Sequence, residues 1–243
     1  FQFDRLEPAE PCETVYFGGG TPTLLSEMQL ERLFSMTARA LRPDSETEIS
    51  IEANPETLTV PKIALLRSFA SRISLGVQSF DARFRATLGR DCEQAALERA
   101  IERVAAARFP HWSCDLIYAI PGQEPADFER DLARAVALGI DHLSCYSLTP
   151  EEGARLADSL IPDEDDAARM WELAGRCGLP RYEISNYAAP GCECRHNRNV
   201  WRGGLLTGLG PAAAGFDGTD RKSEPASLAG WLRGDPPEID AIA

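Results

Sequence analysis

Residues 15–23 read VYFGGGTPT, a short apolar β-type run that stops in three successive glycines, Gly18, Gly19 and Gly20. Glycine has no Cβ, so its backbone can take a positive φ and come into direct contact with a ligand. The bare amide and carbonyl groups at such a strand end can hold an ammonium or carboxylate group that a side chain would crowd out. By themselves, the glycines are equally compatible with a tight turn from a strand into a helix.

Strand-like and helix-like segments alternate along the rest of the chain. The strand-like segments are Thr14–Phe17 and residues 48–52, 72–77, 113–117, 142–148 and 181–185. The helix-like segments are residues 26–41, 61–69, 81–88, 93–107, 126–138 and 163–177. This alternation predicts βα units around a parallel sheet.

Each of the first five strands ends in polar or backbone-exposing residues. In chain order these are residues 18–21, Glu52 to Asn54, Gln78 with Ser79, Asp115, and Thr149 with Glu151. If the βα units close into a barrel, these strand ends share one rim, where the active sites of such barrels lie. An open, doubly wound sheet would gather ligand groups at the same edge, so the pattern predicts a site without deciding closure.

Composition narrows the functional class. The formal net charge is −13 over 243 residues, which argues against a nucleic-acid-binding surface and against docking on anionic lipid. No apolar run approaches the length of a transmembrane helix, and no signal peptide is visible. The seven cysteines are irregularly spaced and odd in number, which favours a cytoplasmic protein over a secreted disulfide framework.

A long, collinear series of motifs resembles the radical S-adenosylmethionine superfamily. Within that superfamily, the chain looks closest to the group of oxygen-independent coproporphyrinogen III oxidases and HemW-type heme chaperones. The matching strings are GGGTP at 18–22, EANP at 52–55, ISLGVQSF at 73–80, LGR at 88–90, DLIY at 115–118, PGQ at 121–123, LTPE at 148–151, PDED at 162–165, YEISN at 182–186 and RHN at 195–197.

The resemblance implies an α/β fold, a partial (β/α)6 TIM-like barrel with parallel strands. Residues 1–160 would form the barrel core, and residues 161–243 a C-terminal extension that packs on it. The C-terminal helical domain that family members usually carry is expected to be absent or truncated.

The resemblance also implies a set of contacts to S-adenosylmethionine. The methionine end of the cofactor would lie on Gly18, Gly19, Gly20 and Thr21. Further contacts would come from Glu52, Gln78, Arg90 and Asp115, and from a weaker match at Thr149. Carboxylates and amides can accept hydrogen bonds from ribose hydroxyls or an ammonium, and an arginine can bind a carboxylate with two nitrogens.

The expected iron–sulfur ligands are missing from this sequence. The family binds a 4Fe-4S cluster through a C-x-x-x-C-x-x-C motif that precedes the glycine strand. In the family's chemistry, the cluster supplies the electron that cleaves the cofactor to a 5′-deoxyadenosyl radical. Here only Cys12 lies before Gly18, and the chain begins at Phe1. We expect that the motif preceded Phe1 or lay in a missing segment; the alternative is a relative without a cluster.

A second group of potential ligands, Cys192, Cys194 and His196, lies within five residues. C-x-C-x-H does not have the usual spacing of a structural zinc site, so a loop with incidental cysteines is the favoured interpretation. His196 matches the family's His-Asn motif, which implies a heme ligand, since imidazole is a common axial ligand of heme iron. The alternative is a histidine that anchors the loop through a hydrogen bond.

The sequence as a whole predicts a cytoplasmic radical S-adenosylmethionine protein that binds heme and hands it to a heme-accepting protein. One alternative is an enzyme that acts on a porphyrin or another substrate by oxidative decarboxylation, methylation or cyclopropanation. An alternative of another class is a non-catalytic heme carrier without the cluster. Whether the chain is an oxidoreductase-like enzyme stays open, because the cluster motif is absent from it.

Overall fold

The computed structural model describes residues 12–90, 92–149 and 164–241. Its main sheet has six strands in the order β1-β2-β3-β4-β5-β6. These are β1 (Thr14–Phe17), β2 (Glu48–Ala53), β3 (Arg72–Gln78), β4 (His111–Tyr118), β5 (His142–Ser147) and β6 (Asn186–Ala188). The pairings from β1 to β5 are all parallel, as the βα alternation predicted.

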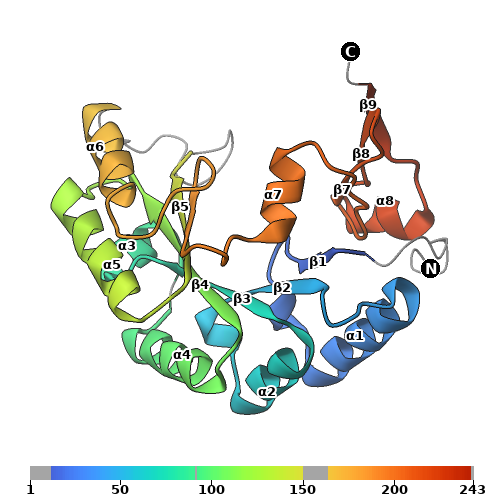
Figure 1. Ribbon diagram of the computed structural model, residues 1–243, viewed down its shortest axis with the longest axis horizontal. Helices are drawn as coiled ribbons and strands as arrows, with labels where there is room; N and C mark the ends of the chain where they lie inside the picture. The colour runs from blue at the N-terminus through green and yellow to red at the C-terminus, as the bar shows by residue number, and fades with distance from the viewer. Residues whose placement is uncertain (1–11, 91, 150–163, 242–243) are drawn as a thin grey trace.

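The helices of the described residues follow the strands in sequence. They are α1 (Glu27–Leu41), α2 (Val60–Phe69), α3 (Ala82–Thr87), α4 (Gln94–Ala107), α5 (Pro125–Ala137), α6 (Glu164–Ala174), α7 (Arg195–Trp201) and α8 (Leu228–Arg233). A second, antiparallel sheet contains β7 (Ala214–Phe216), β8 (Asp220–Ser223) and β9 (Glu238–Ala241). In Figure 1 this small sheet and α8 lie beyond the β1 edge of the main sheet.

Local sequence signals place several helix starts. Ser26 caps α1 and forms a reciprocal capping box with Gln29. Thr59 caps α2 by accepting a hydrogen bond from the amide of Lys62. The predicted bounds of the elements from β1 to α5 lie within two residues of the observed ones.

The last predicted strand was wrong in place and direction. Residues 181–185 turn back on themselves, so that Arg181 bridges to Tyr187 and the Tyr182 amide donates to the Asn186 carbonyl. The strand is β6, and it runs antiparallel to β5. This hairpin reverses the chain immediately before β6, so β6 pairs antiparallel with β5 although α6 lies between the two strands in the sequence. The barrel is therefore partial, with five parallel strands and one antiparallel strand.

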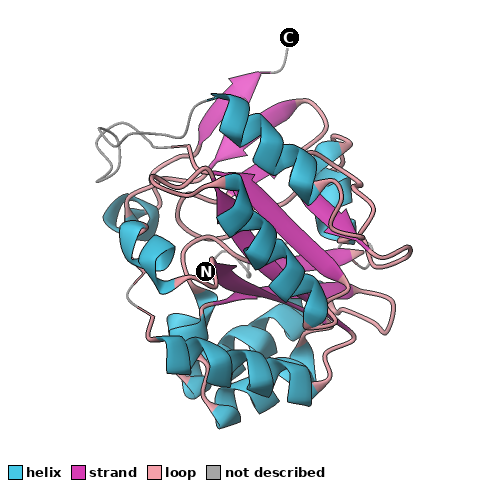
Figure 2. Cartoon of the chain, turned by 90° about the vertical axis from the view of Figure 1, so that its left-hand side faces the viewer, coloured by secondary structure: helices cyan, strands magenta, loops and turns pink. Residues whose placement is uncertain are grey.

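The two faces of the main sheet differ in polarity. Ile49, Ile51, Ile73 and Leu75 point to the outer face and are almost fully buried there. Figure 1 shows α1, α2, α4 and α5 along this convex face, with α7 on the opposite side, and Figure 2 shows the helices covering the strands from the α5 side. The hydrophobic core thus lies outside the sheet, between strands and helices.

Two predictions fall on residues outside the described part of the chain. The domain boundary at residues 160–161 and the motif residues Pro150, Glu151, Pro162 and Asp163 lie there. The domain division stays a prediction. Within the described residues, no helix is both long enough and apolar enough to span a lipid bilayer.

The outer core should be sensitive to loss of Phe128 of α5, which is fully buried and packs against the Tyr118 ring with 5.3 Å between ring centroids. We expect Phe128→Ala to lower the free energy of unfolding by about 3–5 kcal/mol because it leaves a cavity. Val136 lies on the same helix and is half-exposed, so Val136→Ala should cost less than about 0.5 kcal/mol. Urea unfolding measures both; equal losses would contradict this description of the core.

Candidate functional site

A cavity of about 410 Å3 occupies the inside of the sheet. We call it the barrel cavity. Side chains from five adjacent strands and from the segment around α7 line it, and most of them are polar. The lining residues include Tyr16, Gly20, Thr21, Ser50, Glu52, Asn54, Arg72, Ser74, Gly76, Gln78, Arg90, Ser113, Asp115, His142, Ser144, Tyr146, Cys194 and Asn197.

The structure brings most of the residues predicted from the sequence together. Six of them line the barrel cavity directly: Gly20, Thr21, Glu52, Gln78, Arg90 and Asp115. Gly18 and Gly19 are not among the lining residues and lie in the turn that leads to Gly20. Thr149 is different, because it is exposed two residues beyond the end of β5 and is not among the lining residues.

The end of β1 needs a glycine for steric reasons. A Cβ at position 18 would lie 2.5 Å from Cε1 of Tyr16 and 2.9 Å from Oε1 of Glu52. The Tyr16 hydroxyl donates a hydrogen bond to that same oxygen over 2.8 Å. Gly19 and Gly20 then take φ values of +71° and +79°, which side chains disfavour. The turn therefore exposes its backbone beside the Glu52 carboxylate.

Gln78 reaches the cavity through an irregularity in β3. The register of β3 against β4 shifts between Gly76 and Gln78, and Gln78 has a φ of +64°. Bulges of this kind re-aim a side chain and are common beside active sites. A Cβ on Gly76 would lie 3.0 Å from Nε2 of Gln78, so Gly76 leaves room for the amide.

Buried charged groups hold the loops that follow β3. The Asp131 carboxylate accepts hydrogen bonds from the Ser79 hydroxyl and, over 2.9 Å, from the Phe80 amide. The guanidinium of Arg85 is buried and donates to the Ser79 carbonyl over 2.8 Å. The Arg85 carbonyl in turn accepts from the amide of Arg90. Arg90 is thus an exposed cation on a fixed turn at the mouth of the cavity.

Asp115 lines the cavity from within β4. The Ser74 hydroxyl lies 2.6 Å from that of Ser113 and donates to Oδ1 of Asp115 over 2.8 Å. Burial raises the pKa of the Asp115 carboxyl to about 6; hydrogen bonds from Ser74 and Ser144 oppose the rise and the nearby Glu52 charge adds to it. The Asp115 carboxyl can therefore gain or lose a proton close to neutral pH.

The inward-facing residues in the middle and at the start of the strands were not among the predicted site residues. Ser50, Ser74, Ser113 and Ser144 alternate with apolar residues in β2, β3, β4 and β5. The period of two in each strand carries the signal, because successive side chains point to opposite faces. The predicted site residues came instead from the strand ends and from the family motifs.

The segment between β6 and α7 closes the lower end of the cavity, where the strands begin. Arg72 and Glu48 form a buried ion pair at 3.3 Å, and Arg72 also donates to the Cys192 carbonyl over 2.9 Å. The Cys194 thiol donates to Oε1 of Glu48 over 3.4 Å. Nearby, Nε2 of His142 lies 2.8 Å from the Tyr182 hydroxyl. Burial lowers the pKa of His142 to about 3, so its imidazole is neutral.

Cys192, Cys194 and His196 do not converge on one ion. Cys194 faces the Glu48 carboxylate inside, whereas Cys192 faces the opposite side, toward Asp141. In His196, Nδ1 lies 3.0 Å from the Thr14 hydroxyl, and the ring stacks on Tyr16 with centroids 4.9 Å apart. Burial lowers the pKa of His196. These contacts fit the loop-anchoring alternative and leave Nε2 as the nitrogen for a ligand role.

Comparison with known proteins supplies the family. The model of the Radical SAM superfamily matches residues 2–135. The chain belongs to the radical SAM superfamily. It is 39% identical over 226 residues to the heme chaperone HemW of Mycobacterium tuberculosis strain H37Rv, covering 88% of this chain and 57% of that protein. It is 34% identical to the heme chaperone HemW of Bacillus subtilis over 221 residues, covering 86% of this chain and 58% of that protein.

A solved structure shows the same fold. Coproporphyrinogen III oxidase from Escherichia coli, a radical SAM enzyme, superposes with a TM-score of 0.80 at 21% sequence identity, covering 95% of this chain and 60% of that one. The predicted relationship to the HemW and coproporphyrinogen oxidase group is confirmed. The chain spans a little over half the length of the curated relatives it matches.

The radical SAM superfamily implies S-adenosylmethionine and a 4Fe-4S cluster, and the residues present fit only the first. The cavity has an open glycine turn, and the buried Ser50 hydroxyl that lines it has no protein partner among the described residues. Such a polar wall suits a polar ligand. The cluster is different, because Cys12 is the single cysteine before Gly18. The residues of this chain do not form the expected ligand set.

The elevated pKa of Asp115 makes the stability of the ligand-free protein depend on pH. Below about pH 4 the carboxyl is protonated in both the folded and unfolded states, and as pH rises through about 6 the folded state loses up to about 3 kcal/mol by holding a buried charge. Asp115→Asn avoids this loss. The difference in melting temperature between Asp115→Asn and the wild type should therefore shift in favour of the variant as pH rises from about 4 to about 8.

Thermal unfolding across this pH range measures the effect. Glu31→Gln, which changes an exposed carboxylate on α1, is the matched control and should follow the wild type at each pH. A difference between Asp115→Asn and wild type that does not vary with pH would contradict the assignment.

Proposed function

We propose that this chain is the S-adenosylmethionine-binding barrel of a heme chaperone of the HemW type. The observation that carries the proposal is the barrel cavity, in which Glu52, Gln78, Arg90 and Asp115 meet from separate βα units beside the Gly18–Gly20 turn. The similarity to HemW proteins supports the second half of the proposal, since those relatives are named heme chaperones.

The chemistry of the cavity matches the parts of the cofactor. S-adenosylmethionine carries an α-amino acid and a nucleoside on one sulfonium centre. The sulfonium is the reactive group that the cofactor would supply when bound. The exposed backbone after β1 and the Glu52 carboxylate suit the ammonium group, and the Arg90 guanidinium suits the carboxylate. Asp115 and Gln78 can accept hydrogen bonds from ribose hydroxyls or from base nitrogens.

The chain contributes binding, orientation and exclusion of water. The Ser74–Asp115 bond and the Tyr16–Glu52 bond hold both carboxylates in place before a ligand arrives. The Arg72–Glu48 pair and the segment that it anchors close the lower end of the cavity. A ligand would therefore enter from the rim where Arg90 lies, and the walls would keep it in one orientation.

Heme binding would involve His196, Val200 and Trp201 of α7, which are not among the residues that line the barrel cavity. The contact between Thr14 and Nδ1 of His196 fixes the imidazole ring, so that Nε2 is available to coordinate iron. Val200 and Trp201 on the same helix are exposed and apolar, as a porphyrin-facing surface requires. The proposed partners are heme and a protein that accepts it.

Loss of Glu52 tests the cofactor site. We expect Glu52→Ala to weaken S-adenosylmethionine binding at least about tenfold, because a charge-assisted hydrogen bond is lost. Isothermal titration calorimetry measures the affinity, and circular dichroism checks folding. Glu31→Ala removes an exposed carboxylate on α1 and should bind like the wild type. If Glu52→Ala also binds like the wild type, the cavity is not the cofactor site.

Loss of His196 tests the heme ligand. Titration with heme, followed by Soret absorbance, should show a shifted band for the wild type and loss of that band or weaker binding for His196→Ala. Glu31→Ala, which removes an exposed carboxylate on α1, should keep the wild-type band position and affinity. An unchanged spectrum and affinity in His196→Ala would refute the ligand role and leave the cofactor proposal standing.

A further inference from the structure

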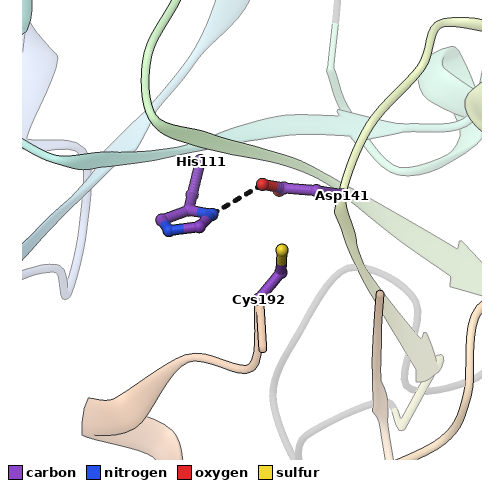
Figure 3. Close-up of side chains that lie close together, drawn as sticks. All are labelled: His111, Asp141 and Cys192. Carbon is purple, nitrogen blue, oxygen red and sulfur yellow. Dashed lines mark hydrogen bonds and ion pairs between the residues drawn. The ribbon is translucent and has the colours of Figure 1, made fainter. Parts of the chain in front are cut away.

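Three side chains from distant parts of the chain meet at the end of the barrel opposite the Arg90 rim. His111 is the first residue of β4, Asp141 immediately precedes β5, and Cys192 lies in the loop between β6 and α7. One ligand atom from each lies within 4.8 Å of the others, and Figure 3 shows all three directed toward a common point. None of them lines the barrel cavity.

Main-chain hydrogen bonds hold this cluster in place. Oδ1 of Asp141 accepts from the Trp112 amide over 3.2 Å, which leaves Oδ2 turned toward His111. The Asp141 carbonyl accepts from the Ala189 amide, and the Ala189 carbonyl accepts from the Cys192 amide, each over 2.9 Å. The loop that carries Cys192 is therefore fastened to the residue whose carboxylate its thiol faces.

The donor atoms are those that zinc prefers. An imidazole nitrogen, a carboxylate oxygen and a thiolate sulfur are its three usual protein ligands. One carboxylate and one thiolate balance the charge of a divalent ion. Nδ1 of His111 lies 2.6 Å from Oδ2 of Asp141; an ion between them would replace that hydrogen bond after a small separation of the two groups.

We propose that His111, Asp141 and Cys192 form a zinc-binding site at the foot of the barrel. The side chains of His111 and Asp141 are 30% and 23% exposed, so the ion can enter from solvent and take water as a fourth ligand. The site is independent of the proposed cofactor and heme sites, because it shares no residue with either.

Zinc at this site would fasten the segment between β6 and α7, which closes the lower end of the barrel cavity, to the main sheet. Cys192 offers its carbonyl to Arg72 on the inner side, while its thiol reaches the strand starts of β4 and β5. An ion would therefore link β4, the start of β5 and the loop before α7. Binding should stabilise the folded state by mass action, since the unfolded chain does not hold the three ligands together.

Cobalt(II) is a spectroscopic probe for this site. We expect the full chain to bind one equivalent of Co2+ with a thiolate-to-metal charge-transfer band in the near ultraviolet, and Zn2+ to displace it. Cys192→Ser should abolish the band, and Asp141→Asn should weaken binding because the anionic ligand oxygen is lost. Cys177→Ser removes another half-buried free thiol and serves as the matched control, with the wild-type band.

Thermal unfolding gives a second readout for the same variants. Added Zn2+ should raise the melting temperature of the wild type and of Cys177→Ser, but not that of Cys192→Ser. Far-ultraviolet circular dichroism confirms that each variant folds. Absence of the charge-transfer band in the wild type, or its persistence in Cys192→Ser, would overturn the proposal whatever the outcome of the S-adenosylmethionine and heme titrations.

Discussion

The polarity of the inner face of the main sheet is the constraint on which the other features depend. In a closed eight-stranded (β/α)8 barrel, bulky apolar side chains fill the interior. Here the inward positions of β2 to β5 carry serines and charged groups, and polar groups can be buried only with partners. The Ser74–Asp115 and Tyr16–Glu52 hydrogen bonds satisfy part of this requirement. The other inward-facing polar groups surround an open cavity, which apolar side chains would have filled.

Stability must then come from the outer face. The buried isoleucines and leucines of the strands pack there against α1, α2, α4 and α5, so each strand separates an apolar layer from a polar one. This division lets the inner residues serve binding, because few of them are needed for packing. It also explains why Asp115 can keep a raised pKa: its burial cost is offset by the core on the other side of the same strand.

The two ends of the cavity are built differently. The upper rim consists of a glycine turn, a bulged strand end and a loop held by the buried Arg85. At the lower end, the Arg72–Glu48 pair binds main-chain carbonyls and a thiol of the segment before α7. A buried ion pair of this kind is costly unless its remaining hydrogen-bonding groups find partners. The segment supplies partners for Nη2 of Arg72 and for Glu48, whereas Nε and Nη1 of Arg72 have no protein partner among the described residues. Closure of the cavity and burial of the pair therefore depend on each other.

The βα order, the parallel sheet and the glycine strand end could be predicted from the sequence, because they follow from local periodicity. Most of the residues that line the upper rim could also be predicted, from polar strand ends and from the motifs that the chain shares with its family. The sequence did not determine the direction of β6, since a hairpin at residues 181–185 reads like a strand until its partners are known. Nor could it separate Cys192 from Cys194, or join Cys192 to His111 and Asp141. These points became visible in the three-dimensional structure, because they depend on contacts between segments far apart in the chain, on which sequence spacing carries no information.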